Sequence, residues 1–204
     1  MSSRETILAA IGRTKGTTRQ PSPLPQIPDS QTFTDRLIER FSDTLTGVGG
    51  QVVRVSDWLD IIQHIEQTYR HPSITPAHRI ITMLPELSAV AEVGIGWVEL
   101  APHLLADAEL TIIGAHFGVA ENGAVWLTES LLGHRAAPFI CQHLAVVLDA
   151  NAIVPTMHDA YERIGDADYG FGLFMAGPSK SADIEQSLVM GAHGPKTMTL
   201  FLMV

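Results

Sequence analysis

The sequence predicts an α/β protein with a largely parallel sheet, and three observations lead to this prediction. The chain has 204 residues, 46% hydrophobic and 17% charged, which is enough apolar material for one large core. Segments of strand character alternate with segments of helical spacing. Several strand segments, such as 110–113 and 144–148, are continuous apolar runs, which are typical of parallel strands covered on both faces.

The N-terminal region is expected to stand apart from this domain. Residues 2 to about 12 predict a short amphipathic helix, because Ile7, Leu8 and Ile11 recur at helical spacing and Ser2 or Ser3 can cap it. Four prolines between Gly16 and Pro28 then predict an extended connector. We therefore expect a helix and Pro-rich linker over 1–28 and the main domain over 29–204.

The elements of the main domain follow in order. A helix is predicted from Thr34 to about Leu45, ended by glycines, and then a strand over Gln51–Val55. Ser56 or Asp57 is expected to cap the next helix, which starts near Trp58. An Asn-Gly pair at 122–123, between apolar runs, predicts a hairpin inserted into the parallel core. Further strands are expected at 79–83, 110–113, 118–120, 124–128, 144–148, 170–176 and 197–203, and further helices at 156–163 and 182–190.

Composition excludes several classes of protein. The net charge of −9 argues against a nucleic-acid binder, which normally carries a basic surface. The single cysteine, Cys141, rules out a disulfide framework, a Cys₄ zinc site and a self-contained iron–sulfur cluster. No His-x-x-x-His spacing occurs, so no metal site is expected. We see no secretory leader at the polar start and no apolar run long enough to span a membrane, and we expect a cytoplasmic protein.

The C-terminal segment is the most informative for chemistry. It reads Gly177 to Glu185 and then Gly191 to Lys196, and it predicts a strand, a turn, a helix and a second turn. Ser179 and Ser181 lie at the predicted start of that helix, and Lys180 adds a cation, so the turn could bind a phosphate or a carboxylate. Alternatively, Ser181 is simply an N-cap. His193, between two glycines, is either a functional group or a partner of the last helical carbonyls.

A second segment, residues 114–128, carries one acid in an apolar, glycine-rich stretch. Burial would adapt that residue, Glu121, to proton transfer or nucleophilic attack, whereas at an exposed hairpin tip it would be a simple turn residue. Arg135, in the loop after Glu129, could clamp a substrate carboxylate or be solvated. Cys141 and Trp126 are expected to be core residues.

These two segments together resemble the LUD domain, specifically the lactate-utilisation protein C family. The matching stretches are Ala120–Ala124, Arg135, Gly177–Glu185 and Gly191–Pro195. There are departures: the family's two threonines are Asn122 and Ala124 here, and its later threonine is Ser181. The resemblance implies a three-layer α/β/α fold with a mainly parallel sheet, similar to that of sugar-phosphate isomerases and CoA-transferases, with ligands at the carboxyl ends of the strands.

The resemblance also implies a function. It points to a component of an L-lactate oxidation system that forms pyruvate, with no cofactor in this chain and with iron–sulfur clusters on partner subunits. In that case Glu121 and His193 would move a proton, while the small anionic ligand would be held by Ser179, Lys180, Ser181 and Arg135. Two alternatives stay open: a stand-alone enzyme on a phosphorylated or CoA-linked small molecule, and a non-catalytic regulatory or assembly subunit whose helix 2–12 binds a partner.

Overall fold

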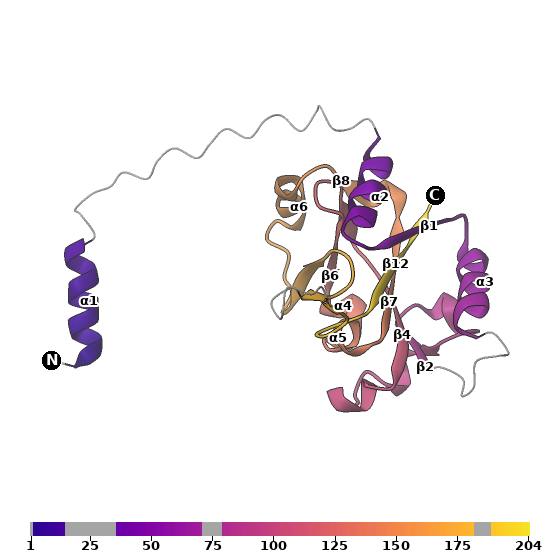
Figure 1. Ribbon diagram of the computed structural model, residues 1–204, viewed down its shortest axis with the longest axis horizontal. Helices are drawn as coiled ribbons and strands as arrows, with labels where there is room; N and C mark the ends of the chain where they lie inside the picture. Colours follow the sequence, from indigo (N-terminus) through magenta and orange to yellow (C-terminus); the bar gives the residue numbers. More distant parts are fainter. Residues whose placement is uncertain (1, 15–35, 71–78, 182–188) are drawn as a thin grey trace.

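The computed structural model describes residues 2–14, 36–70, 79–181 and 189–204. Its main sheet has six strands in the order β1-β12-β7-β4-β2-β3, and each neighbouring pair is parallel (Figure 1). The predicted α/β class is therefore confirmed. The strands are β1 Gln51–Val55, β12 Thr197–Met203, β7 His143–Asp149, β4 Ala108–Gly114, β2 Arg79–Thr82 and β3 Glu92–Val93.

The hairpin at Asn122-Gly123 belongs to a second, smaller sheet. Its strands are β8 Ile153–Val154, β5 Phe117–Val119, β6 Ala124–Thr128 and β9 Gly172–Met175, in that order. β5 and β6 are antiparallel, which confirms the hairpin, and β6 also pairs antiparallel with β9. The excursion is not inserted into the parallel sheet as expected. Both faces of β5 and β6 are buried, so the hairpin needs a cover on each side and forms a layer of its own.

Helices and the smaller sheet sandwich the main sheet. Helix α3 (Trp58–Tyr69) packs on one face. Helix α2 (Leu37–Gly47), the short α4 (Glu129–Leu132) and α5 (Ala137–Ile140), and the smaller sheet pack on the other face. Helix α6 (Met157–Ile164) covers the outer face of the smaller sheet. This is a three-layer α/β fold with an additional sheet and helix on one side. The 3-10 turns are η2 Pro85–Leu87, η3 Gly94–Gly96, η4 Pro102–Leu105 and η5 Ala150–Ala152.

Of the described α-helices between residues 36 and 204, two begin with a side-chain cap. The Asp57 carboxylate accepts hydrogen bonds from the backbone N–H groups of Leu59 and Asp60, at 2.8 and 3.1 Å. At α6, Thr156 and Asp159 form a capping box. These caps satisfy backbone donors that lack a partner inside the helix, so the boundaries predicted at 57 and 156 are confirmed to within a residue.

Two core residues were predicted correctly. Cys141 is 2% exposed in the large core between the main sheet and the α2 side. Trp126 is 7% exposed in a separate cluster with Phe117, Ala160 and Ile164, between the smaller sheet and α6. The protein thus has two packed layers on the α2 side of its main sheet, and the outer one is rich in aromatic residues.

The N-terminal helix also forms where the sequence predicts it. Helix α1 covers Ser3–Thr14, and Figure 1 shows it apart from the sheets. Ile7, Leu8 and Ile11 are 59, 52 and 46% exposed. The predicted connector over 16–28 lies outside the described residues. Among the described helices, none is long and apolar enough to cross a membrane.

The helix predicted over 182–190 is wrong at its C-terminal end. Val189–Met190 forms strand β11, which pairs antiparallel with β10, Lys180–Ser181. Gly191, with a φ of +74°, therefore follows a strand and not a helix. Residues 182–188 lie outside the described residues. The prediction that Ser181 caps a helix there is therefore not tested by the structure.

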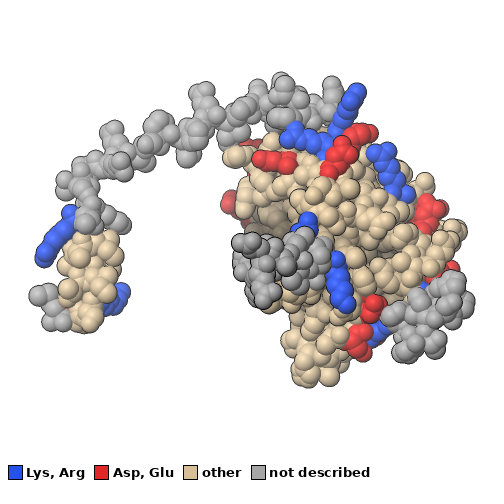
Figure 2. Space-filling model, viewed as in Figure 1, with Lys and Arg blue, Asp and Glu red and all other residues tan. Residues whose placement is uncertain are grey.

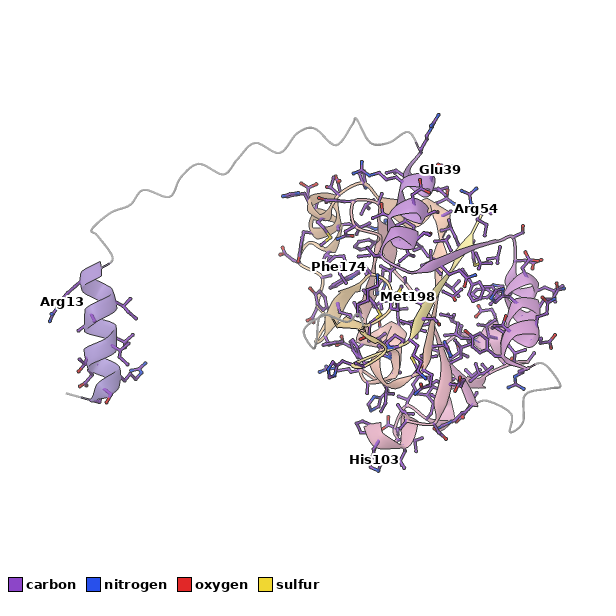
Figure 3. The ribbon with its side chains drawn as sticks, viewed as in Figure 1. Arg13, Glu39, Arg54, His103, Phe174 and Met198 are labelled. Atoms are coloured by element: carbon purple, nitrogen blue, oxygen red, sulfur yellow. The ribbon has the colours of Figure 1, made fainter. Side chains whose placement is uncertain are left out.

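Charged side chains of both signs lie over α2 and the adjoining strand edge (Figure 2). One pair there is Glu39 of α2 and Arg54 of β1, which lie near each other in Figure 3, with Oε1 and Nη2 separated by 3.8 Å. Both side chains are 55% exposed, so this pair contributes little to stability.

Candidate functional site

The turn that carries Glu121 has a geometry that only glycine can adopt. Gly123 has a φ of +69°, and its N–H donates to the Val119 carbonyl at 2.9 Å. A Cβ atom at this position would lie 2.7 Å from the backbone nitrogen of Leu45 in α2. The Asn122 side chain accepts a hydrogen bond from the Ala124 N–H at 3.0 Å, which closes the turn. The Asn122-Gly123 pair therefore allows the β5–β6 turn to lie close against α2.

Glu121 lies on the exposed side of this turn. Its carboxylate accepts a hydrogen bond from the backbone N–H of Met157, the first residue of α6, at 2.8 Å. A carboxylate at this position satisfies an otherwise unpaired helical donor and complements the positive end of the helix dipole. Glu121 therefore has a structural role that connects the β5–β6 turn to α6.

The C-terminal motif is built around two more glycines with positive φ. Gly177 has a φ of +74°, and a Cβ there would lie 2.8 Å from the carbonyl oxygen of Val48, just after α2. Gly49 has a φ of +91°, and the ammonium nitrogen of Lys180 lies 3.0 Å from the position its Cβ would take. Because Val125 pairs with Met175 in the smaller sheet, the Glu121 turn and the Gly177 turn lie at the same end of that sheet.

We call this meeting point of Gly49, Gly123 and Gly177 around the C-terminal end of α2 the glycine junction. The structure thus brings together the two motifs that the sequence singles out. The Ser179 backbone N–H donates to the Pro195 carbonyl, and the Gly191 N–H donates to the Ser179 carbonyl, each at 3.0 Å. These bonds join the Gly177 turn to the loop 191–196 through main-chain groups.

The loop that carries His193 has an unexpected place in the fold. It leads directly into β12, and the Lys196 N–H donates to the Gln142 carbonyl, just before β7, at 2.8 Å. His193 is therefore exposed at the amino ends of the central strands. The resemblance implied a ligand at the carboxyl ends, so the fold does not place this residue at the expected edge.

Arg135 already has partners. Its guanidinium lies over the ring of Phe171, with 5.3 Å from Cζ to the centroid, and 3.9 Å from a carboxylate oxygen of Glu129. The Glu129 carboxylate also accepts from the backbone N–H groups of Gly170 and Phe171, at 2.6 and 2.5 Å. Burial alone would raise the pKa of Glu129, but these hydrogen bonds and Arg135 together lower it. These contacts of Arg135 and Glu129 connect α4 with the segment just before β9.

Next to this ion pair is a cavity of about 430 Å³, which we call the aromatic cavity. It lies between the outer face of the smaller sheet and the C-terminal end of α6. Its volume is in the range of small-molecule sites. It is lined by His116, Phe117, Trp126, Thr128, Glu129, Ser130, Arg163, Ile164, Ala167, Asp168 and Tyr169. Among the described lining residues there is none of those predicted to form a site, although Arg135 pairs with the lining residue Glu129.

One side of the aromatic cavity carries a chain of hydrogen bonds. The Nε2 atom of His116 lies 2.7 Å from the Thr128 hydroxyl, and that hydroxyl lies 2.9 Å from the Ser130 hydroxyl. His116 lies between β4 and β5, Thr128 is the last residue of β6, and Ser130 is the second residue of α4. Burial, and then the charge of Arg163, lower the pKa of His116, so its imidazole is neutral at neutral pH.

The lining of the cavity also includes the guanidinium of Arg163. Its Cζ atom lies 5.0 Å from the centroid of the Phe117 ring, in a cation–π contact. Within the described ranges, Arg163 forms no ion pair. A stacked guanidinium keeps its N–H edge available, and that edge matches the geometry of a carboxylate.

This cavity was not predicted from the sequence. Its residues come from three separated stretches between 116 and 169, with no compact motif among them. A signal was present, since His116 and Thr128 are polar residues at the ends of apolar strands and Ser130 follows two residues after Thr128. Without the register of β5 and β6, however, nothing indicated that they face one another.

Comparison with known proteins identifies the family. The family model of the LUD domain matches residues 38–203. The chain belongs to the LUD domain family. The resemblance read from the glycine-rich motifs is therefore confirmed, and the three-layer fold it implied is the one observed.

Several relatives of this LUD protein share a name. "Lactate utilization protein C" of Bacillus pumilus is 32% identical over 98 residues, which is 45% of this chain and 41% of that protein. "Lactate utilization protein C 1" of Bacillus mycoides is 34% identical over 108 residues, 50% of this chain and 46% of that protein. The protein of this name from Geobacillus kaustophilus is 35% identical over 97 residues, 43% of this chain and 40% of that protein. In each case the matched stretch spans less than half of the relative.

One solved structure is also similar. It is a DUF162 family protein from Deinococcus radiodurans, with a TM-score of 0.56 and 17% identity, covering 82% of this chain and 96% of that one. At this identity the likeness concerns the fold, and it agrees with the arrangement of sheets and helices described above.

Proposed function

We propose that this protein is a component of an L-lactate utilisation system that oxidises lactate to pyruvate together with separate iron–sulfur subunits. The observation that supports this most is the match of the LUD domain to residues 38–203, together with relatives named lactate utilization protein C. Since less than half of those relatives is matched, the lactate assignment comes from their names and is a proposal for this chain.

The cysteine content supports separate iron–sulfur subunits. A cluster held by thiolates needs several cysteines, and this chain has one. Cys141 is buried at 2% exposure, and burial raises its pKa to about 11. A thiol that stays protonated and covered is a poor metal ligand. If the system uses thiolate-held iron–sulfur clusters, their cysteines lie outside these 204 residues.

A complementation experiment tests the role in lactate utilisation. The chain is expressed in a bacterium that grows on L-lactate and whose own lactate utilization protein C gene has been deleted. We expect growth on L-lactate to return, while growth on pyruvate is the same with and without the chain. Failure to restore growth, with the protein present and folded in the cells, would count against the proposal.

A second observation favours a role in assembly. Helix α1 exposes the apolar side chains of Ile7, Leu8 and Ile11. An amphipathic helix with exposed apolar residues is suited to lie in a groove of another protein. We therefore propose that α1 contacts the iron–sulfur subunits. Deletion of residues 1–28 is expected to abolish co-purification with them, and the matched variant carries Ser at positions 7, 8 and 11. If both variants still co-purify, α1 is not the contact.

A further inference from the structure

The lining of the aromatic cavity includes two kinds of polar group that can contact an anionic ligand. Arg163 supplies a positive charge held in place by the Phe117 ring. The chain of His116, Thr128 and Ser130 supplies hydroxyl and imidazole groups. A ligand that uses both must carry an anionic group and a second polar oxygen close to it.

We propose that the aromatic cavity binds small organic acids with an oxygen on the carbon next to the carboxylate, in both the 2-hydroxy and the 2-oxo form. Arg163 holds the carboxylate, and the Ser130 end of the hydrogen-bond chain contacts the neighbouring oxygen. This proposal rests on the proposed function for the choice of lactate and pyruvate as probes. Its geometry needs only the shared chemistry of the two acids.

The donors and acceptors along the hydrogen-bond chain of His116, Thr128 and Ser130 can be exchanged. The chain can therefore contact either the hydroxyl of a 2-hydroxy acid or the carbonyl of a 2-oxo acid. When His116 accepts at Nε2 from Thr128, and Thr128 accepts from Ser130, the Ser130 oxygen is left to accept a proton from a ligand hydroxyl. When His116 donates from Nε2 to Thr128, the Thr128 proton turns to Ser130 and Ser130 donates to a ligand carbonyl. A change of His116 tautomer therefore converts a site for a 2-hydroxy acid into a site for a 2-oxo acid.

Two acids also line the cavity, and they differ in their effect on an anion. The Glu129 carboxylate is engaged by two backbone N–H groups and Arg135, so much of its charge is compensated. Asp168 is exposed, and its charge opposes a bound carboxylate. Removal of the Asp168 charge should therefore strengthen binding, while removal of the Arg163 charge should weaken it.

The test measures binding of L-lactate, pyruvate, propionate and inorganic phosphate to the full chain by titration calorimetry. Propionate has the carboxylate without the neighbouring oxygen, and phosphate is a general anion. We expect lactate and pyruvate to bind with Kd values no weaker than about 10 mM and propionate to bind about tenfold more weakly, since one hydrogen bond is lost. Phosphate binding as tight as lactate binding would overturn the proposed ligand class and indicate a general anion site.

Variants assign the roles. Arg163→Gln should lower the affinity for both acids by about tenfold or more, because a charge-assisted bond is removed. Asp168→Asn should raise it. Arg54→Gln, which changes an exposed arginine on β1, is the matched control and should bind as the wild type does. Equal affinity of Arg163→Gln and the wild type would overturn the assignment of Arg163.

The tautomer is the decisive readout for His116. Nitrogen NMR of the imidazole should show Nε2 without a proton when lactate is bound and with a proton when pyruvate is bound. Ser130→Ala, a change at an exposed residue, should remove this difference between the two ligands. The same tautomer in both complexes would overturn the proposed reversal.

The two proposals can fail separately. If the chain restores growth on lactate but binds neither acid, the cavity proposal is wrong and the role in lactate utilisation stands. If the acids bind as described but the chain does not restore growth, the cavity proposal stands and the proposed function is wrong.

Discussion

The glycine junction and the aromatic cavity are built in opposite ways. The junction comes from short, contiguous motifs that can be read along the chain, and each of its three glycines lies close to another segment. The cavity comes from separated residues that only the smaller sheet and α6 bring together. In this protein the compact motifs therefore encode a close approach of backbone segments, while the polar side chains that can contact a ligand lie in the cavity.

The largest expected effect concerns the wall of the cavity. Trp126→Ala should lower the free energy of unfolding by about 4 kcal/mol, because a buried ring packed 4.7 Å from the Phe174 ring is lost. The control is Tyr161→Ala on α6, whose ring also lies against Phe174 but is 63% exposed, and which should cost less than about 1 kcal/mol. Urea unfolding followed by circular dichroism measures both. A loss at Trp126 as small as that at Tyr161 would mean that this wall is not a packed layer.

The second effect tests the glycine junction. Gly123→Ala should destabilise by about 3 kcal/mol, since the added Cβ requires a disfavoured φ and collides with the backbone of Leu45. Gly47→Ala is the matched control at the end of α2, where a Cβ would meet nothing within 4 Å. It should be neutral or stabilise by up to about 1 kcal/mol. Equal stability of the two variants in urea would contradict the role of the junction.

The third prediction separates a structural role from a chemical role at Glu121. Glu121→Ala should cost about 1 kcal/mol, because the N–H of Met157 loses its acceptor at the start of α6. Glu121→Gln keeps an acceptor oxygen and should cost less. Thermal unfolding compares the two, with growth on L-lactate as the second measurement. If Glu121→Gln is as stable as the wild type but no longer supports growth, Glu121 takes part in the chemistry after all.

The smallest effect is a pH dependence from the cavity. The pKa of His116 is lowered in the folded state, so below its ordinary value of 6.5 the unfolded chain binds more protons than the folded one. Stability should therefore fall as the pH drops from about 7 to 5. His116→Gln should reduce this slope, and His64→Gln should remove a separate share, since burial also lowers the pKa of His64. Urea titrations at several pH values measure the slope, and an unchanged slope in His116→Gln would contradict the prediction.

Much of the fold could be predicted from the sequence because local signals decide it. The valine-rich segment at 51–55, the cap at Asp57 and the Asn-Gly pair at 122–123 each act within a few residues, and each element forms as predicted. The strand at 189–190 was not predicted, because no local signal decides it. Its partner, Lys180–Ser181, is required to make it a strand, and that pairing is not a local property.

The candidate site residues likewise divide into properties that local sequence predicts and properties that depend on distant contacts. The sequence identified Glu121, Ser179, Lys180 and His193 as unusual, and the structure brings their motifs together around α2. It could not indicate that Glu121 bonds to the N–H of Met157, 36 residues away. Nor could it indicate that Arg163 stacks on Phe117, which lies on a strand far from α6 in the chain.

By itself, then, the sequence determined the α/β class, most element boundaries, the LUD domain family and the absence of a set of cysteines for a cluster. The tertiary structure alone decided that the hairpin forms its own sheet, that the His193 loop lies at the amino ends of the central strands, and that His116, Thr128, Ser130 and Arg163 surround one cavity. The physical reason is the distance along the chain over which each interaction acts. Hydrophobic period, caps and turns act between near neighbours, whereas a cavity exists only after strand register has fixed which distant side chains face each other.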